Sequence, residues 1–260
     1  MFNPNRVLCG ALLAFALISS QTARADDEKA VNLIVKPKVG HVSRIKTILK
    51  TSVMGMDVVV NETQKATVKE VKENGDVVEE MAMESITLNI GGMDRDQPAP
   101  PPTTITRDKF GKLKEYKAEE AAGAFMTPEI AKLMASLSTS LLTDRALKTN
   151  DTWQTELENP AVKEKKVTVK DTYLGIDKVD GKDYWKVKQT AEAVVDADGS
   201  KMTYEFTVWI DPMSGDAFKI DGTVKDVPTQ VGPITMQITS TAVKPDDKDK
   251  AEVKKDAPKP

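Results

Sequence analysis

The feature that most limits what this chain can fold into is a strict alternation of apolar and polar residues in its last third. Between residues 202 and 208 every second residue is large and apolar, and the residues between them are threonine or glutamate. The same two-residue period recurs at 234–238. A period of two is typical of β-strands that bury one face, so both segments are predicted strands of a half-buried sheet.

Short turn signals connect these strands to further alternating segments. Segments 167–173, 185–195 and 218–224 repeat the period. The connections carry Asp-Gly or Pro-containing sequences that favour tight turns, namely Val179-Asp180-Gly181, Asp198-Gly199-Ser200 and Asp211-Pro212-Met213-Ser214-Gly215. Five consecutive strands with links of hairpin length predict an antiparallel meander.

The first half of the chain shows a similar but less regular pattern. Asn74-Gly75 predicts a hairpin that joins a strand at 63–72 to one at 76–90. In the second strand the apolar phase changes near Glu84-Ser85, which a β-bulge would explain. Segment 42–53 fits both a helical stripe and a strand, but its β-branched residues and the lack of a helix N-cap favour a strand.

Proline and one amphipathic stripe mark the middle of the chain. Gln97-Pro98-Ala99-Pro100-Pro101-Pro102 cannot join a central sheet and predicts a surface linker over 93–104. A small hairpin is expected around 109–112. Thr127 as a cap and Pro128 in the first turn predict a helix over 128–142 that packs on a sheet. Its apolar stripe consists of Ile130, Leu133, Met134, Leu137 and Leu141.

These patterns predict a mainly β protein (α+β). We expect a long curved antiparallel sheet or half-barrel of about nine to ten strands with one covering helix. The expected organisation is a single β-rich domain over 26–243, which consists of an N-terminal part (40–92), the linker, the helix and a C-terminal meander (150–243).

Both ends of the chain are expected to lie outside this domain. Arg6, an apolar run of about a dozen residues and the small-x-small sequence Ala23-Arg24-Ala25 predict a signal peptide over 1–25. The alternative, a membrane anchor, needs a longer apolar run. We therefore expect an exported protein, periplasmic or extracellular, with no integral membrane segment after processing. The tail at 244–260 is rich in Lys, Asp and Pro and is expected to be disordered.

Candidate catalytic groups are scarce. His41 is the single histidine of the sequence, and the single cysteine, Cys9, falls within the predicted signal peptide. A Ser-His-Asp or Cys-His site is therefore not expected, and no phosphate-binding or dinucleotide motif occurs. A pI near 5.5 without a basic stripe argues against nucleic acid as a partner. We expect no enzymatic activity, no cofactor and no metal site.

Paired methionines leave three interpretations open. Met54-Gly55-Met56 and Met81-Ala82-Met83 each place two thioethers on one strand face. Flexible methionines fill irregular cores, line apolar ligand cavities, or bind Cu(I) when soft ligands gather. The first of these is the most common use.

Three motifs carry a resemblance to a known family. Asn150-Asp151-Thr152-Trp153, Val179-Asp180-Gly181-Lys182 and the segment 209–215 resemble an uncharacterised family of exported bacterial proteins, known only as a domain of unknown function. The expected architecture is also similar to that of periplasmic lipoprotein-localisation carriers and related lipid-binding proteins. That similarity implies an acyl chain enclosed between sheet and helix.

Two functional hypotheses follow. The first is a carrier or sensor that binds a lipid or other apolar ligand against the curved sheet, with the helix as its lid. The second is a structural or interaction protein of the cell envelope with no small-molecule ligand. The expected partner is accordingly an apolar ligand or an envelope protein. For the first hypothesis the predicted ligand-binding residues are Met202, Tyr204, Phe206, Val208, Met236, Leu133 and Leu137.

Overall fold

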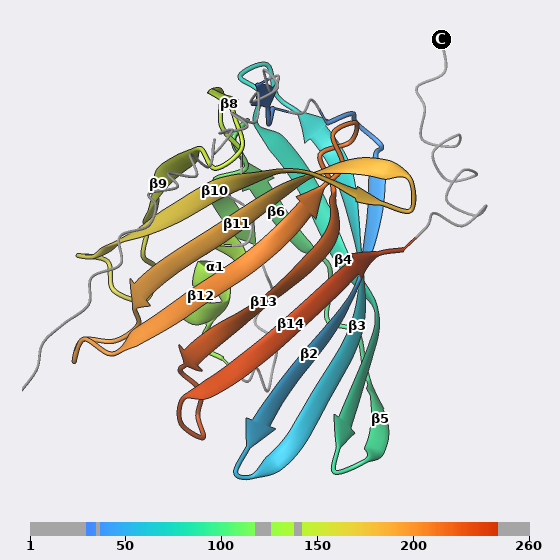
Figure 1. Ribbon diagram of the computed structural model, residues 1–260. Coiled ribbons are helices and arrows are strands. Elements are labelled where there is room, and N and C mark those ends of the chain that lie inside the picture. The colour runs from blue at the N-terminus through green and yellow to red at the C-terminus, as the bar shows by residue number, and fades with distance from the viewer. Residues whose placement is uncertain (1–29, 35–36, 118–125, 138–141, 244–260) are drawn as a thin grey trace, which may run out of the picture.

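One long antiparallel sheet of twelve strands forms the body of the protein (Figure 1). This computed structural model describes residues 30–34, 37–117, 126–137 and 142–243. The strand order is β7-β6-β4-β3-β2-β14-β13-β12-β11-β10-β9, and β5 pairs with β4 beside this path. The sheet is open, because β7 and β9 are its two ends. The predicted fold class is confirmed.

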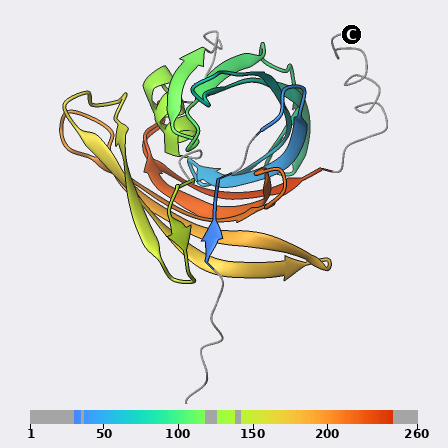
Figure 2. The same cartoon turned by 90° about the horizontal axis from the view of Figure 1, so that it is seen from above.

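The first seven strands belong to the N-terminal half. Their bounds are β1 Val31–Asn32, β2 Val42–Val53, β3 Met56–Val71, β4 Val77–Ile90, β5 Met93–Gln97, β6 Thr103–Arg107 and β7 Leu113–Lys117. The second half holds α1 Pro128–Leu137, β8 Ala146–Leu147, β9 Thr152–Glu158, β10 Lys166–Val179, β11 Lys182–Val194, β12 Lys201–Ile210, β13 Ala217–Val227 and β14 Ile234–Ala242. Viewed from above, the N-terminal strands curl into a tight arc, while the C-terminal strands spread as a flatter layer (Figure 2).

The C-terminal meander confirms the alternation read from the sequence. Along β12 the apolar residues are buried and the threonines and glutamate between them are half-buried or exposed. Register partners Phe206 and Gly222, and Tyr204 and Val224, lie side by side on β12 and β13. Their face is the hydrophobic core, which α1 completes with Ile130, Leu133 and Leu137.

The predicted bulge in β4 is present and has the predicted effect. Ser85 pairs with Thr63 and Met83 pairs with Gln64, so Glu84 is the extra residue. The bulge restores the phase of the strand, because Met83 and Ile86 then lie on the same face. The strand prediction for 42–53 and the hairpin prediction at Asn74-Gly75 are also confirmed.

The helix begins as predicted, at Pro128. The N–H of Ile130 donates to Thr127 Oγ1 over 3.4 Å, which is the expected cap. The described part of the helix runs from Pro128 to Leu137, and Leu142 is not helical, so the predicted range 128–142 is too long at its last residue. The intervening residues 138–141 lie outside the described residues.

Two other expectations need correction. Strand β5 and the start of β6 occupy part of 93–104, so only residues 98–102 connect strands there. A small second sheet of β1 and β8 was not expected from the sequence. The predicted signal peptide and the predicted disordered tail lie outside the described residues. Within the described ranges, no helix is both long and apolar enough to span a membrane.

Candidate functional site

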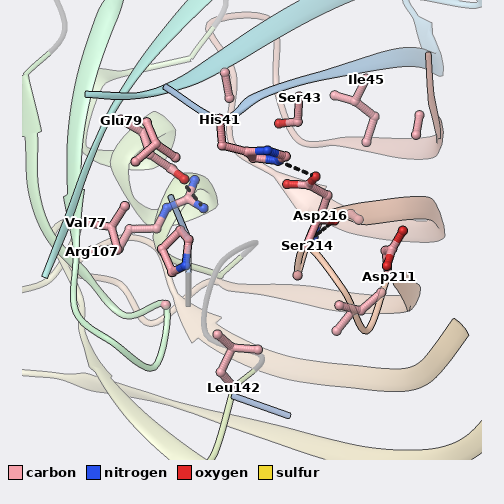
Figure 3. A pocket seen from close by; sticks show the side chains of 18 of the residues that line it. His41, Ser43, Ile45, Val77, Glu79, Arg107, Leu142, Asp211, Ser214 and Asp216 are labelled. Atoms are coloured by element: carbon pink, nitrogen blue, oxygen red, sulfur yellow. Dashed lines mark hydrogen bonds and ion pairs between the residues drawn. The ribbon is translucent and has the colours of Figure 1, made fainter. Parts of the chain in front are cut away.

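A cavity of about 880 Å³ opens at one end of the curled half of the sheet. The start of β2, the end of β3 and the start of β4 are neighbours in the sheet, and the curl brings them close to segments far away in the sequence. The end of β6 and the β12–β13 turn complete the cavity wall (Figure 3). This size lies within the range of about 300–1,000 Å³ that is typical of small-molecule pockets.

Most side chains of the cavity wall are apolar. They include Ile45, Val68, Val77, Met81, Val208, Ile210, Phe218 and Ile220. The aromatic ring of Phe218 stacks on that of Tyr184, another wall residue, with centroids 4.2 Å apart. The cavity therefore offers mainly hydrophobic contacts to whatever occupies it.

An ion pair from opposite ends of the chain forms one polar part of the wall. His41 Nε2 lies 2.7 Å from Asp216 Oδ2, and both side chains are partly buried. The turn Asp211–Asp216 holds the carboxylate in place, since the N–H of Gly215 donates to the Asp211 carbonyl over 2.8 Å. The hydrogen bond that His41 donates to Asp216 raises the pKa of His41 against the opposing effect of burial, and the negative charges of Asp216, Glu79 and Asp211 add to the rise.

A second ion pair lies across the same cavity. Arg107 Nη1 is 3.4 Å from Glu79 Oε2. Val77 on β4 pairs in register with Arg107 on β6, and Glu79 follows two residues later on the same face of β4. Figure 3 shows both side chains facing the space that His41 also faces.

Ser214 brings a hydroxyl group into the turn that carries Asp216. Ser214 Oγ accepts the backbone N–H of Asp216 over 3.2 Å and so stabilises the turn. In the part of the chain that the structure describes, His41 makes no hydrogen bond with a serine or threonine hydroxyl. Nor do three or more His, Cys, Asp or Glu side chains gather to hold a metal ion among these residues.

The seven ligand-binding residues predicted from the sequence lie mostly in the packed core. Their exposed fractions are 4% or less, and all seven belong to one core cluster. Val208 lines the cavity, whereas Leu133, Leu137 and the other four are not among its wall residues. Among the described residues, none of Pro128–Leu137 in α1 lines this cavity, and Leu142 is the wall residue nearest to that helix in sequence.

Sequence reasoning missed the polar wall residues. It treated His41 as an isolated histidine and did not consider Asp216, Arg107 or Glu79. One signal was present, because Val77-x-Glu79-x-Met81 places a carboxylate on the apolar face of a predicted strand. A charged residue at an inward position of a strand is a candidate for function.

Comparisons with known proteins give no family. No protein-family model matches the chain. No curated protein matches it either.

Several solved structures match the chain at low similarity. A lipovitellin structure concerned with lipid–protein interactions has 9% identity and a TM-score of 0.42 over 79% of this chain. The alignment spans only 25% of that lipovitellin chain. A β-barrel-like protein of domain of unknown function DUF1849 from Brucella abortus has 12% identity and a TM-score of 0.30, over 82% of this chain and 98% of its own.

An outer membrane lipoprotein-sorting protein domain from Vibrio parahaemolyticus is also similar. It has 9% identity and a TM-score of 0.24, over 84% of this chain and 94% of its own. The names of the last two neighbours, a domain of unknown function and a lipoprotein-sorting domain, are of the kinds that the sequence resemblance named. Because their TM-scores are below 0.5, they assign neither a family nor a function.

Proposed function

We propose that this protein is an exported, non-enzymatic carrier or sensor that binds an apolar ligand in the 880 Å³ cavity. The observation that carries the proposal is the cavity itself, which is lined mainly by apolar side chains. Protein interiors are close-packed and contain few voids larger than a water molecule. An apolar space of this size is therefore explained better by an occupant than by imperfect packing.

The polar groups of the wall support binding rather than turnover. His41 is paired with Asp216 and Arg107 with Glu79, so both of these basic groups already have a carboxylate partner. A general base needs a proton to abstract from a positioned nucleophile. The hydroxyl of Ser214 is instead engaged with its own turn. These pairs are better suited to orienting a ligand than to activating one.

A second candidate function has its own observation. Met54, Met56 and Met93 are exposed by 79%, 51% and 60% and lie at the ends of two neighbouring hairpins. The register of β3 with β4 places these hairpin tips side by side. Exposed apolar tips of this kind favour an interaction protein of the cell envelope.

A cavity-blocking variant with a matched control tests the carrier proposal. Ala66 lines the cavity and pairs with Met81, whereas Ala82 follows Met81 and lies on the opposite face of the sheet. Ala66→Phe should place a phenyl ring in the cavity and obstruct it, and Ala82→Phe should not. N-phenylnaphthylamine, an uncharged apolar probe, is titrated into each folded protein and its fluorescence is recorded.

We expect saturable binding to the wild type and to Ala82→Phe, and at least tenfold weaker binding to Ala66→Phe. A tenfold change corresponds to about 1.4 kcal/mol. If the wild type does not bind the probe, or if folded Ala66→Phe binds it equally well, the carrier proposal is wrong. Circular dichroism of each variant verifies the fold.

A further inference from the structure

The Arg107 side chain has few hydrogen-bond partners for a cation that is largely buried. It is only 25% exposed, and the one ion pair or hydrogen bond of its side chain among the described residues is the pair with Glu79 at 3.4 Å. The Nε atom is cut off from solvent and has no hydrogen-bond partner among those residues. A guanidinium group carries five N–H donors, and leaving buried donors unpaired is costly.

The carboxylates of the wall show no matching deficit. Glu79 and Asp216 each have a basic partner, and none of their oxygens is both buried and unpaired. The spare hydrogen-bonding capacity of the polar wall is therefore on the donor side. A ligand group that accepts hydrogen bonds fits this imbalance better than one that donates them.

His41 adds a second donor to the same region. Its Nε2 faces Asp216, and its Nδ1 has no partner in the described part of the chain. The surrounding carboxylates of Asp216, Glu79 and Asp211 favour the protonated ring, in which Nδ1 also carries a proton. Glu79 connects the two basic groups, since it contacts Arg107 and its charge also acts on His41.

We infer that the ligand is an amphiphile whose head group presents an anionic oxygen, as a carboxylate or phosphate does, to Arg107 with His41 beside it. This inference rests on the proposed carrier function and names its ligand class. A planar guanidinium takes such a head group through two parallel hydrogen bonds along its Nε–Nη edge. Binding requires the guanidinium to turn this edge toward the cavity, while the acyl chain lies against the apolar wall.

Probes with one chain and different head groups test the inference. Lauric acid, lauryl phosphate, lauryl alcohol and laurylamine are titrated calorimetrically into the wild type and into Arg107→Gln. Arg95→Gln is the matched control, because Arg95 is an exposed arginine of β5 away from the cavity wall. Acetate and inorganic phosphate test whether the chain is needed.

In the wild type and in Arg95→Gln, the acid and the phosphate should bind at least tenfold more tightly than the alcohol. In Arg107→Gln this preference should be lost, so that the acid and the alcohol bind within about threefold of each other. The tenfold preference of the wild type corresponds to about 1.4 kcal/mol. Arg107→Lys, which keeps the charge but not the planar edge, should retain only part of the preference. Acetate and inorganic phosphate should bind at least a hundredfold more weakly than their lauryl counterparts.

The possible failures are distinguishable. If the alcohol or the amine binds the wild type as tightly as the acid, the head-group inference is wrong and the carrier proposal stands. A preference for the acid that survives in folded Arg107→Gln also overturns it. If neither these amphiphiles nor N-phenylnaphthylamine binds, the carrier proposal itself is wrong.

Discussion

Replacing Asp171 by Asn is expected to stabilise the protein at neutral pH. The wild-type core buries this carboxyl group without a partner that would stabilise its ionised form. Asp171 lies on β10 between its register partners Trp153 and Gln189, and it is fully buried. Neither of its oxygens has a hydrogen-bond partner among the described residues. Burial raises the pKa of Asp171 to about 8, and the neighbouring amide of Gln189 opposes part of this rise.

The sign and size of the effect follow from proton linkage. Because the folded-state pKa of Asp171 is raised, the folded protein binds more protons than the unfolded chain between pH 3.8 and about 8. The free energy of unfolding therefore falls as pH rises through this window, by about 1.4 kcal/mol per pH unit. At pH 7 the accumulated cost is about 4 kcal/mol, which is a large fraction of the typical total of about 5–15 kcal/mol.

Urea unfolding followed by tryptophan fluorescence measures this cost. Asparagine has nearly the same shape and does not ionise, so Asp171→Asn should be about 4 kcal/mol more stable than the wild type at pH 7. The difference should shrink toward zero near pH 4. Parallel stability profiles for the two proteins across this range would refute the reasoning.

Asp177 on the same strand provides a control of opposite sign. It accepts hydrogen bonds from Trp209 Nε1 over 2.8 Å and from Lys186 Nζ over 3.2 Å. These bonds, that of Trp209 first, lower the pKa of Asp177, so its contribution to stability is present above its unfolded pKa and is lost as pH falls. Asp177→Asn should therefore destabilise the protein at neutral pH.

Three further predictions concern separate parts of the molecule. His41→Gln removes the ion pair with Asp216. Because the pKa of His41 is raised, that pair stabilises the fold fully below about pH 6.5, and its contribution is lost as pH rises through the raised value. Urea unfolding should therefore show a larger loss of unfolding free energy at pH 5.5 than at pH 8.5. Gly222→Ala would bring a Cβ atom within 2.7 Å of Phe206 Cγ; we expect a loss of about 1–3 kcal/mol or more in the same assay, and an unchanged midpoint would show that the strands are not packed this closely. Mass spectrometry of exported protein should give a mature N-terminus at Asp26, and an intact Met1 would contradict the predicted signal peptide.

The fold could be predicted largely because its determinants are local. A strand that buries one face must alternate, so the pattern at 202–210 specified β12 without knowledge of its neighbours. The bulge at Glu84 was visible for the same reason, since one extra residue shifts the phase of the pattern. Strand β5 was not predicted, because its sequence, Met93–Gln97, is mostly charged and its residues are exposed.

The site could not be predicted, because it depends on how far the sheet curls. His41 and Asp216 are 175 residues apart in sequence and meet because β14 pairs with both β2 and β13, which places the starts of these two strands at one end of the sheet. No local pattern encodes that long-range strand order or the curl of the sheet. The sequence did reveal two apolar surfaces, on β12 and on α1, but not whether they would touch. They pack together into the core, and the cavity lies at the end of the sheet, with only Val208 of the predicted residues in its wall.

Native mass spectrometry of protein purified from its own host shows whether the cavity holds a ligand in the cell. We expect a co-purifying amphiphile on the wild type and on Ala82→Phe, and its absence from Ala66→Phe, whose new ring lies in the cavity. Tandem spectra should identify an acyl chain with a carboxylate or phosphate head group. A wild-type protein that carries no ligand and takes up neither fatty acid nor phospholipid would overturn the carrier proposal and leave the envelope-interaction function.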